Sequence, residues 1–232
     1  MTGLAPRTLI VNADDFGLSS GVNAGIAAAH ERGVVTSASL MVRRSAAAPA
    51  AAYASKHPDL AVGLHVDLGE WTFLDGQWVA TEEVAGPVEV ELSAQLSEFR
   101  RLLGHDPTHL DSHQHVHHKE PVLSLLRSLA ASLAVPLRAF SAITYVGDFY
   151  GQTGTGAPLH DAITFDALVH VLRKLGPGFT ELGCHPGCDE IGGSTYGAER
   201  AIETATLCDP RLRAVLDNFE IRLTSFAAFA SR

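Results

Sequence analysis

The segment from His109 to His118 concentrates the side chains of this sequence that are best suited to metal binding or proton transfer. Five histidines and one aspartate fall within these ten residues. Histidine is the commonest protein ligand for borderline divalent metals, and its ring titrates near neutral pH. In an extended strand, alternate side chains share one face. The residues that would share it here are His109, Asp111, His113, His115 and His117. The segment predicts a metal or proton-transfer site, against the alternative of a histidine-rich or solvated surface loop.

A pair of adjacent carboxylates, Asp14 and Asp15, follows the first apolar run of the chain. Neighbouring carboxylates repel each other, and capping of the next helix accounts for only one of them. A bound cation makes both useful, because one carboxylate can ligate it while the other stays ionised beside the positive charge and acts as a base. The pair therefore indicates either a helix cap or, with a cation, a catalytic site.

Two isolated histidines, His65 and His185, stand in or directly after apolar runs. A single histidine in such a place is more often a hydrogen-bonded core residue than a ligand. Two features favour a functional role. His65 is expected near the end of a strand, and the Pro-Gly after His185 predicts a turn that exposes the ring. Both interpretations stay open from these residues alone.

Short β-like runs alternate with helical runs along the chain. The runs that predict strands are 8–13, 34–42, 60–68, 108–112, 136–143, 179–184 and 220–224. The runs that predict helices are 21–32, 45–57, 89–103, 121–131, 165–175, 196–207 and 210–218. The polar segment 69–87 is expected to form a surface loop or a small hairpin. About seven strands and as many helices predict a single α/β domain over residues 1–232, built on an open or closed parallel sheet.

The expected strands place the polar residues at one edge of this sheet. In parallel α/β folds the carboxyl ends of the strands form one face, and active sites are assembled on it. The side chains that this rule brings together are Asp14, Asp15, His65, His113 and His185. They are therefore predicted to form one site, although they are distant in the sequence.

Composition and charge exclude several classes of partner. The 232 residues are 46% hydrophobic and 19% charged, with a formal net charge of −9. Nucleic acids and anionic membranes bind clustered basic residues, and the basic runs here are no longer than two residues, so neither partner is expected. No apolar stretch approaches transmembrane length. Three cysteines, an odd number, and an N-terminus without a secretory pattern predict a cytoplasmic location.

The motifs together resemble the YdjC-like (ChbG-type) carbohydrate deacetylases, relatives of the polysaccharide deacetylases. The matching stretches are 9–17, 33–42, 62–65, 108–117, 181–187, 208–212 and 221–226. The resemblance thus spans nearly the whole chain. It implies a distorted, TIM-barrel-like (β/α) barrel of about seven parallel strands. The loop after His65 is shorter than in many members, and Asp67 stands where an apolar residue is usual, which leaves the substrate open.

The resemblance also implies roles for the candidate residues. Asp15, His65 and His113 are expected to ligate one divalent metal ion, with Asp14 as base and His185 as acid. Residues expected to orient the ligands or to face the substrate are Asp111, His115, His117 and Arg138. Two imidazoles with one carboxylate suit zinc by softness, whereas the family is often described with magnesium, so the ion is Mg or Zn.

The expected reaction removes the N-acetyl group from a small acetylated carbohydrate, a chito-oligosaccharide or a glycoconjugate. A homodimer is compatible with the sequence. Aromatic residues that could stack on sugar rings, or simply pack, are Trp71, Phe73, Trp78, Tyr145, Phe149 and Tyr150.

Two other functions are open. A phosphoesterase or amidohydrolase would also use Asp and His ligands. Phosphoesterases usually add cationic groups that bind the phosphate, and the segments expected near the site offer few beyond Arg43, Arg44 and Arg138. A non-catalytic metal- or sugar-binding protein would leave the Asp14–Asp15 pair unexplained.

Overall fold

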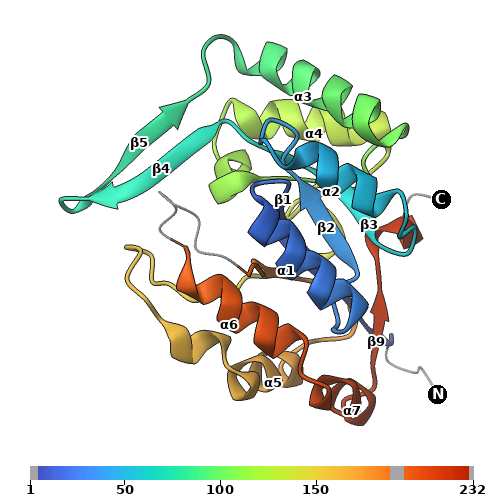
Figure 1. Ribbon diagram of the computed structural model, residues 1–232. Coiled ribbons are helices and arrows are strands. Elements are labelled where there is room, and N and C mark those ends of the chain that lie inside the picture. Colours follow the sequence, from blue (N-terminus) through green and yellow to red (C-terminus); the bar gives the residue numbers. More distant parts are fainter. Residues whose placement is uncertain (1–4, 189–195, 230–232) are drawn as a thin grey trace.

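A computed structural model describes residues 5–188 and 196–229, and its centre is a seven-stranded parallel sheet (Figure 1). The strands of this sheet are β1 (Arg7–Phe16), β2 (Ser37–Leu40), β3 (Ala61–Val66), β6 (Leu110–Ser112), β7 (Thr144–Val146), β8 (Gly178–Cys184) and β9 (Ile221–Thr224). Their order is β6-β3-β2-β1-β8-β7, and β9 pairs with the first half of β1. On one side of β1 the strands run in sequence order through β2 and β3 to β6, and on the other side β7 leads to β8, which pairs with β1. This is the arrangement of a barrel opened between β6 and β7.

The opening between β6 and β7 is bridged by one parallel contact, from Leu110 to Leu137. This geometry confirms the predicted distorted (β/α) barrel. In detail, the strand expected over 136–143 was wrong. Ala139 adopts a positive φ of 61°, which a non-glycine residue rarely takes, and this interrupts the extended run before β7 begins. Arg138 is thereby turned from a strand position into the buried interior.

Helices cover the sheet and supply the other side of the core (Figure 1). They are α1 (Ser20–Glu31), α2 (Ala47–Ala54), α3 (Val88–Leu103), α4 (Val122–Leu133), α5 (Phe165–Arg173), α6 (Ala198–Leu207) and α7 (Arg211–Asn218). In α3 the expected apolar stripe is buried at Leu92, Leu96 and Phe99. β1 is buried along nearly its whole length, as parallel strands covered on both faces must be.

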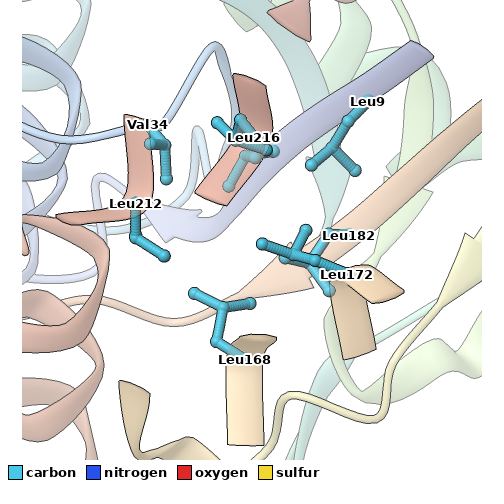
Figure 2. Close-up of a pocket in the computed structure, with 8 residues that line it drawn as sticks. Leu9, Val34, Leu168, Leu172, Leu182, Leu212 and Leu216 are labelled. Carbon is cyan, nitrogen blue, oxygen red and sulfur yellow. The ribbon is translucent and has the colours of Figure 1, made fainter. Parts of the chain in front are cut away.

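The interior is closely packed beneath β1. Figure 2 shows the aliphatic side chains that surround a small gap there. Its lining is Leu9, Val11, Val34, Leu168, Leu172, Leu182, Leu212 and Leu216. The gap measures about 10 Å³, close to the minimum for one water molecule, and the lining offers no polar partner. It belongs to the core packing and is not a ligand site.

The segment 69–87 forms the small hairpin that was one of its two predicted forms. Strands β4 (Gly69–Leu74) and β5 (Gln77–Glu83) pair antiparallel and project away from the barrel (Figure 1). The base of this hairpin contacts the short 3-10 helix that follows β6.

The strand expected over 108–112 forms as β6, but the shared strand face considered for 109–117 was wrong beyond Ser112. There β6 ends, and the chain turns into a 3-10 helix over His113–His118. Gln114 and His115 adopt positive φ angles of 49° and 53°, which end the strand alternation. The five residues of the expected common face therefore do not point the same way. Within the described residues, 3-10 helices also form over His160–Ile163 and Phe226–Phe229.

Some expectations concern properties beyond this architecture. Residues 1–4, where the N-terminal pattern begins, lie outside the described residues, as do 189–195 and 230–232. Within the described ranges, no helix has both the length and the apolar character needed to cross a membrane. The single domain over 1–232, the cytoplasmic location and the homodimer stay predictions.

Candidate active site

Three strand ends bring Asp15, His65 and His113 together at the carboxyl edge of the sheet. Asp15 Oδ1 lies 3.0 Å from His113 Nδ1 and 3.4 Å from His65 Nε2. Asp15 adopts a positive φ of 66° at the end of β1, where the chain leaves the strand. One ligand atom from each of the three residues lies within 4.8 Å of the others. One carboxylate and two imidazoles at this spacing could hold a divalent cation.

Both histidines are also held from behind by carboxylates. His65 sits opposite Asp111 in the β3–β6 ladder, and its Nδ1 donates to Asp111 Oδ1 at 2.8 Å. The Nε2 of His113 donates to Glu70 Oε2, also at 2.8 Å, and Glu70 belongs to the projecting hairpin. A carboxylate on the second ring nitrogen fixes the ring orientation and is the usual arrangement behind a metal-ligating histidine.

The electrostatics of this group favour positive charge. Burial by itself lowers the pKa of His65, but the Asp111 carboxylate overrides it and raises the pKa to about 10. Burial also opposes protonation of His113, yet Asp15 raises the pKa of that ring to about 9. The pKa of Asp15 is held well below its usual range despite burial, chiefly by Arg200. A divalent cation supplies the positive charge that these surroundings favour, so the donor set fits such an ion.

Asp14 lies beside this group in an arginine clamp. Arg138 donates from Nη1 and Nη2 to the two carboxylate oxygens of Asp14, both at 2.6 Å. Asn12 Nδ2 donates to Asp14 Oδ1 at 3.0 Å. Although burial disfavours the charge, Arg138 lowers the pKa of Asp14, so the carboxylate is ionised. The same guanidinium lies 2.8 Å from Asp111 and 2.7 Å from Glu181.

His185 follows β8 and points toward Asp14. Its Nε2 lies 3.8 Å from Asp14 Oδ2, and its backbone N–H donates to Glu203. Burial lowers the pKa of the His185 ring to about 4, so the ring is neutral near pH 7. Glycines set the path of this loop. A Cβ on Gly25 of α1 would lie 2.3 Å from the Cα of Gly187, so a side chain at residue 25 would clash with the backbone of this loop.

The remaining predicted site residues separate into two groups. Asp111 and Arg138 lie in the buried charge network beside the candidate ligands. His115 and His117 contact other groups within the described structure: His115 Nε2 lies 3.5 Å from Tyr145 Oη, and His117 Nδ1 lies 2.6 Å from Ser112 Oγ. Because the chain turns at Gln114 and His115, these two rings do not lie on the strand face that alternation predicted.

The aromatic residues considered for stacking on sugar rings have different environments. Phe149 is fully buried, so it packs in the core and cannot stack on a sugar. Tyr145 lies under Arg138, with 4.8 Å between guanidinium carbon and ring centre. Tyr150 is 5.2 Å from the His185 ring and is partly exposed. On the hairpin, Phe73 packs edge-on against Trp78, which is 53% exposed.

Several residues of the network were missed by sequence reasoning. Glu181 could have been found, because it is a charge within an apolar strand run. Glu70 lies in a polar segment where one more carboxylate carries no signal. Arg200 is in α6, and its Nη2 donates to Asp15 Oδ2 at 2.6 Å. No local sequence pattern predicts this contact.

Comparisons with known proteins show the family to which the chain is similar. A family model described as YdjC-like protein matches residues 8–218. The carbohydrate deacetylase of Geobacillus stearothermophilus is 36% identical, over 97% of this chain and 98% of its own. The chitooligosaccharide deacetylase of Klebsiella pneumoniae (strain 342) is 33% identical, over 95% of this chain and 98% of its own.

Solved structures share the fold. A crystal structure from Enterococcus faecalis V583, of a protein named for cellobiose-phosphate cleavage, has a TM-score of 0.81 at 23% identity and covers 97% of this chain and 99% of that one. The family 4 carbohydrate esterase of Streptomyces lividans has a TM-score of 0.54 at 14% identity, with coverages of 97% and 95%.

Proposed function

The chain belongs to the YdjC-like protein family, and from that premise we propose that it is a metal-dependent carbohydrate deacetylase. Its substrate is a small acetylated sugar of the chito-oligosaccharide or glycoconjugate type, from which it hydrolyses an N-acetyl group. The names of the relatives from Geobacillus and Klebsiella support the reaction and the substrate class.

The observation that carries the proposal is the donor set of Asp15, His65 and His113. Its two rings are each backed by a carboxylate, from Asp111 and Glu70. In this proposal the three residues hold one divalent ion. The two imidazoles favour zinc or a neighbouring transition ion, whereas magnesium prefers oxygen ligands. A divalent ion bound there would lower the pKa of a water molecule and polarise the acetyl carbonyl.

The chain's own residues then move one proton. Asp14, ionised beside Arg138, accepts a proton from the attacking water as the water oxygen bonds to the acetyl carbon. Because Arg138 keeps Asp14 a weak base, the carboxylate passes the proton to His185, whose Nε2 lies 3.8 Å away. The His185 ring donates it to the amide nitrogen as the C–N bond breaks. The products are acetate and the free amino sugar.

In this route His185 acts as the proton donor although its ring is neutral before the reaction. With a pKa of about 4, His185 carries no proton near pH 7 until it receives one. The partly exposed Tyr150, whose ring lies beside His185, would contact a sugar ring.

Phosphate ester hydrolysis fits the surroundings less well. Among the described residues near the site, Arg138 and Arg200 are paired with Asp14 and Asp15. Arg44 lies 2.7 Å from Asp67. Guanidinium groups already paired in this way are poorly placed to bind a phosphate.

The test measures acetate released from acetylated chito-oligosaccharides by chelator-treated protein after addition of zinc, manganese, cobalt or magnesium. We expect acetate release that depends on the added ion and is lost in His113→Ala. Hydrolysis of a chromogenic phosphate ester without acetate release would instead identify a phosphoesterase. Full activity of the chelated protein would contradict metal dependence.

A further inference from the structure

The turn after β6 gathers three histidine rings beside the candidate active site. The ring centres of His115 and His117 are 5.7 Å apart, those of His115 and His118 are 5.6 Å apart, and those of His117 and His118 are 4.5 Å apart. One ring nitrogen from each lies within 4.8 Å of the other two. None of these rings belongs to the Asp15, His65 and His113 set.

Two of these rings are fixed on one nitrogen and leave the other without a partner. His117 is fully buried, and its Nδ1 is held by Ser112 Oγ at 2.6 Å. Its Nε2 is buried and makes no hydrogen bond within the described structure. His115 has Nε2 near Tyr145 Oη, while its buried Nδ1 is also unpartnered. Buried polar atoms are nearly always paired, so two such nitrogens in one turn call for a ligand.

The backbone of the turn is shaped to bring the rings together. Continued strand alternation would send His117 and His118 to opposite faces. Instead, Gln114 and His115 take the left-handed conformation, with φ of 49° and 53°. Non-glycine residues in this region are uncommon and cluster at ligand clamps and active sites.

We propose that His115, His117 and His118 form a second metal site, which binds a borderline divalent ion such as Zn²⁺. Three imidazoles select zinc, copper or nickel over magnesium, which prefers oxygen ligands. His118 is exposed, so an ion reaches the site from solvent. Holding one ring nitrogen on a second group, as Ser112 does for His117, is how ligand histidines are oriented.

The closure that binding requires is small. Zinc–nitrogen bonds of about 2.0–2.1 Å in a tetrahedral site place the ligating nitrogens roughly 3.4 Å apart. Rotation of the exposed His118 ring is the cheapest way to shorten the present spacing, because the rings of His115 and His117 are held by Tyr145 and Ser112. A water molecule would take the fourth position.

The experiment counts zinc ions on the full chain by competition with a chromophoric chelator. The combined variant Asp15→Ala and His65→Ala removes two ligands of the first site. We expect it to keep one zinc per chain. Adding His118→Ala should weaken that zinc at least about tenfold, the scale of metal-site perturbations even by outer groups. Adding His170→Ala instead, which removes an exposed histidine on α5, should leave it unchanged.

Wild-type protein gives a second measurement that does not depend on the combined variant folding. There we expect two zinc ions, reduced to one in His118→Ala, and no displacement of the second ion by excess magnesium. Equal zinc binding by His118→Ala and His170→Ala would overturn the proposal, as would a wild-type stoichiometry of one. These readouts are independent of acetate release, so failure of the proposed reaction is distinguishable from failure of this site.

Discussion

Five histidines of β3 and of the segment around β6 fall into two groups with opposite electrostatics. His65 and His113 lie between carboxylates, which overcome burial and raise their pKa values to about 10 and about 9. His109, His115 and His117 are buried without a carboxylate of comparable influence, and burial lowers their pKa values to about 4, 4 and 3. Histidines of one short segment thus belong to both groups.

The comparison shows that the surroundings of a ring, rather than its place in a motif, decide what it can do. Rings flanked by carboxylates lie where positive charge is favoured, which suits a cation. Rings without such partners are kept neutral, with lone pairs that need hydrogen-bond donors or a metal. Four changes test this division, beginning with the largest expected effect.

Removal of a ring from the carboxylate-flanked group should abolish the reaction. We expect His113→Ala to lower kcat/KM for acetate release by at least about 10³-fold, because the several kcal/mol that a bound ion contributes would be lost. His105→Ala removes an exposed histidine and should leave kcat/KM unchanged. Near-normal activity of His113→Ala would show that this ring ligates nothing essential.

The carboxylate in the arginine clamp should matter for catalysis and not for ion binding. Asp14→Asn should lower kcat roughly 10² to 10³-fold, within the range for a positioned proton acceptor, while the ion remains bound. Acetate release and metal content are measured together, with the exposed Asp148→Asn as control. Loss of the ion in Asp14→Asn would make Asp14 a ligand instead of a base.

A neutral buried ring should make the fold sensitive to acid. His109 stacks on Phe226 and contacts Ser39 Oγ, and its pKa of about 4 lies below the ordinary 6.5. Between pH 6.5 and 4 the unfolded chain binds the additional proton, so stability is full above pH 6.5 and declines as the pH falls toward 4. The contribution of His109 across this window is roughly 3 kcal/mol.

His109→Gln should remove that contribution and flatten the pH dependence of the unfolding free energy. The change is measured by urea unfolding at pH 7, 6, 5 and 4.5. His57→Gln, at a partly exposed ring, is the matched control. An unchanged slope in His109→Gln would mean that folding does not shift the pKa of this ring.

The carboxylate behind His113 should have the smallest effect. Glu70→Gln keeps the shape but removes the charge that orients the ring, and we expect ion affinity to fall about 10 to 100-fold. The exposed Glu83→Gln on the same hairpin should have no effect. Equal ion affinities of the two variants would show that the contact between Glu70 and His113 does not contribute to ion binding.

The proximity of Asp15 and His65 could be predicted from the sequence because it follows from a simple rule. Parallel strands end at one edge, so the strand-end residues Asp15 and His65 had to lie near each other whatever the length of chain between them. The barrel was predictable for the same reason, from alternation of strand and helix.

What was not predictable depended on backbone detail or on single long-range contacts. The positive φ angles at Gln114, His115 and Ala139 occur at residues other than glycine, so the sequence gives no sign of them. They end the strand alternation after Ser112 and interrupt the strand expected over 136–143. Arg200 and Glu70 reach the site from a helix and a hairpin whose local patterns are ordinary. Such contacts are determined by tertiary packing, which periodicity does not encode.

The hydrogen bond that His113 donates to Glu70 connects the hairpin directly to a candidate ligand. Gln114 strengthens this connection, because its side chain bonds both Glu70 and the backbone of Trp71. Thermodynamic linkage is reciprocal: if an occupied ion site holds the hairpin in place, a sugar that rests on the hairpin must tighten the ion by the same factor. Ion and sugar would then bind cooperatively, and the apparent metal affinity of this protein would depend on how much substrate surrounds it.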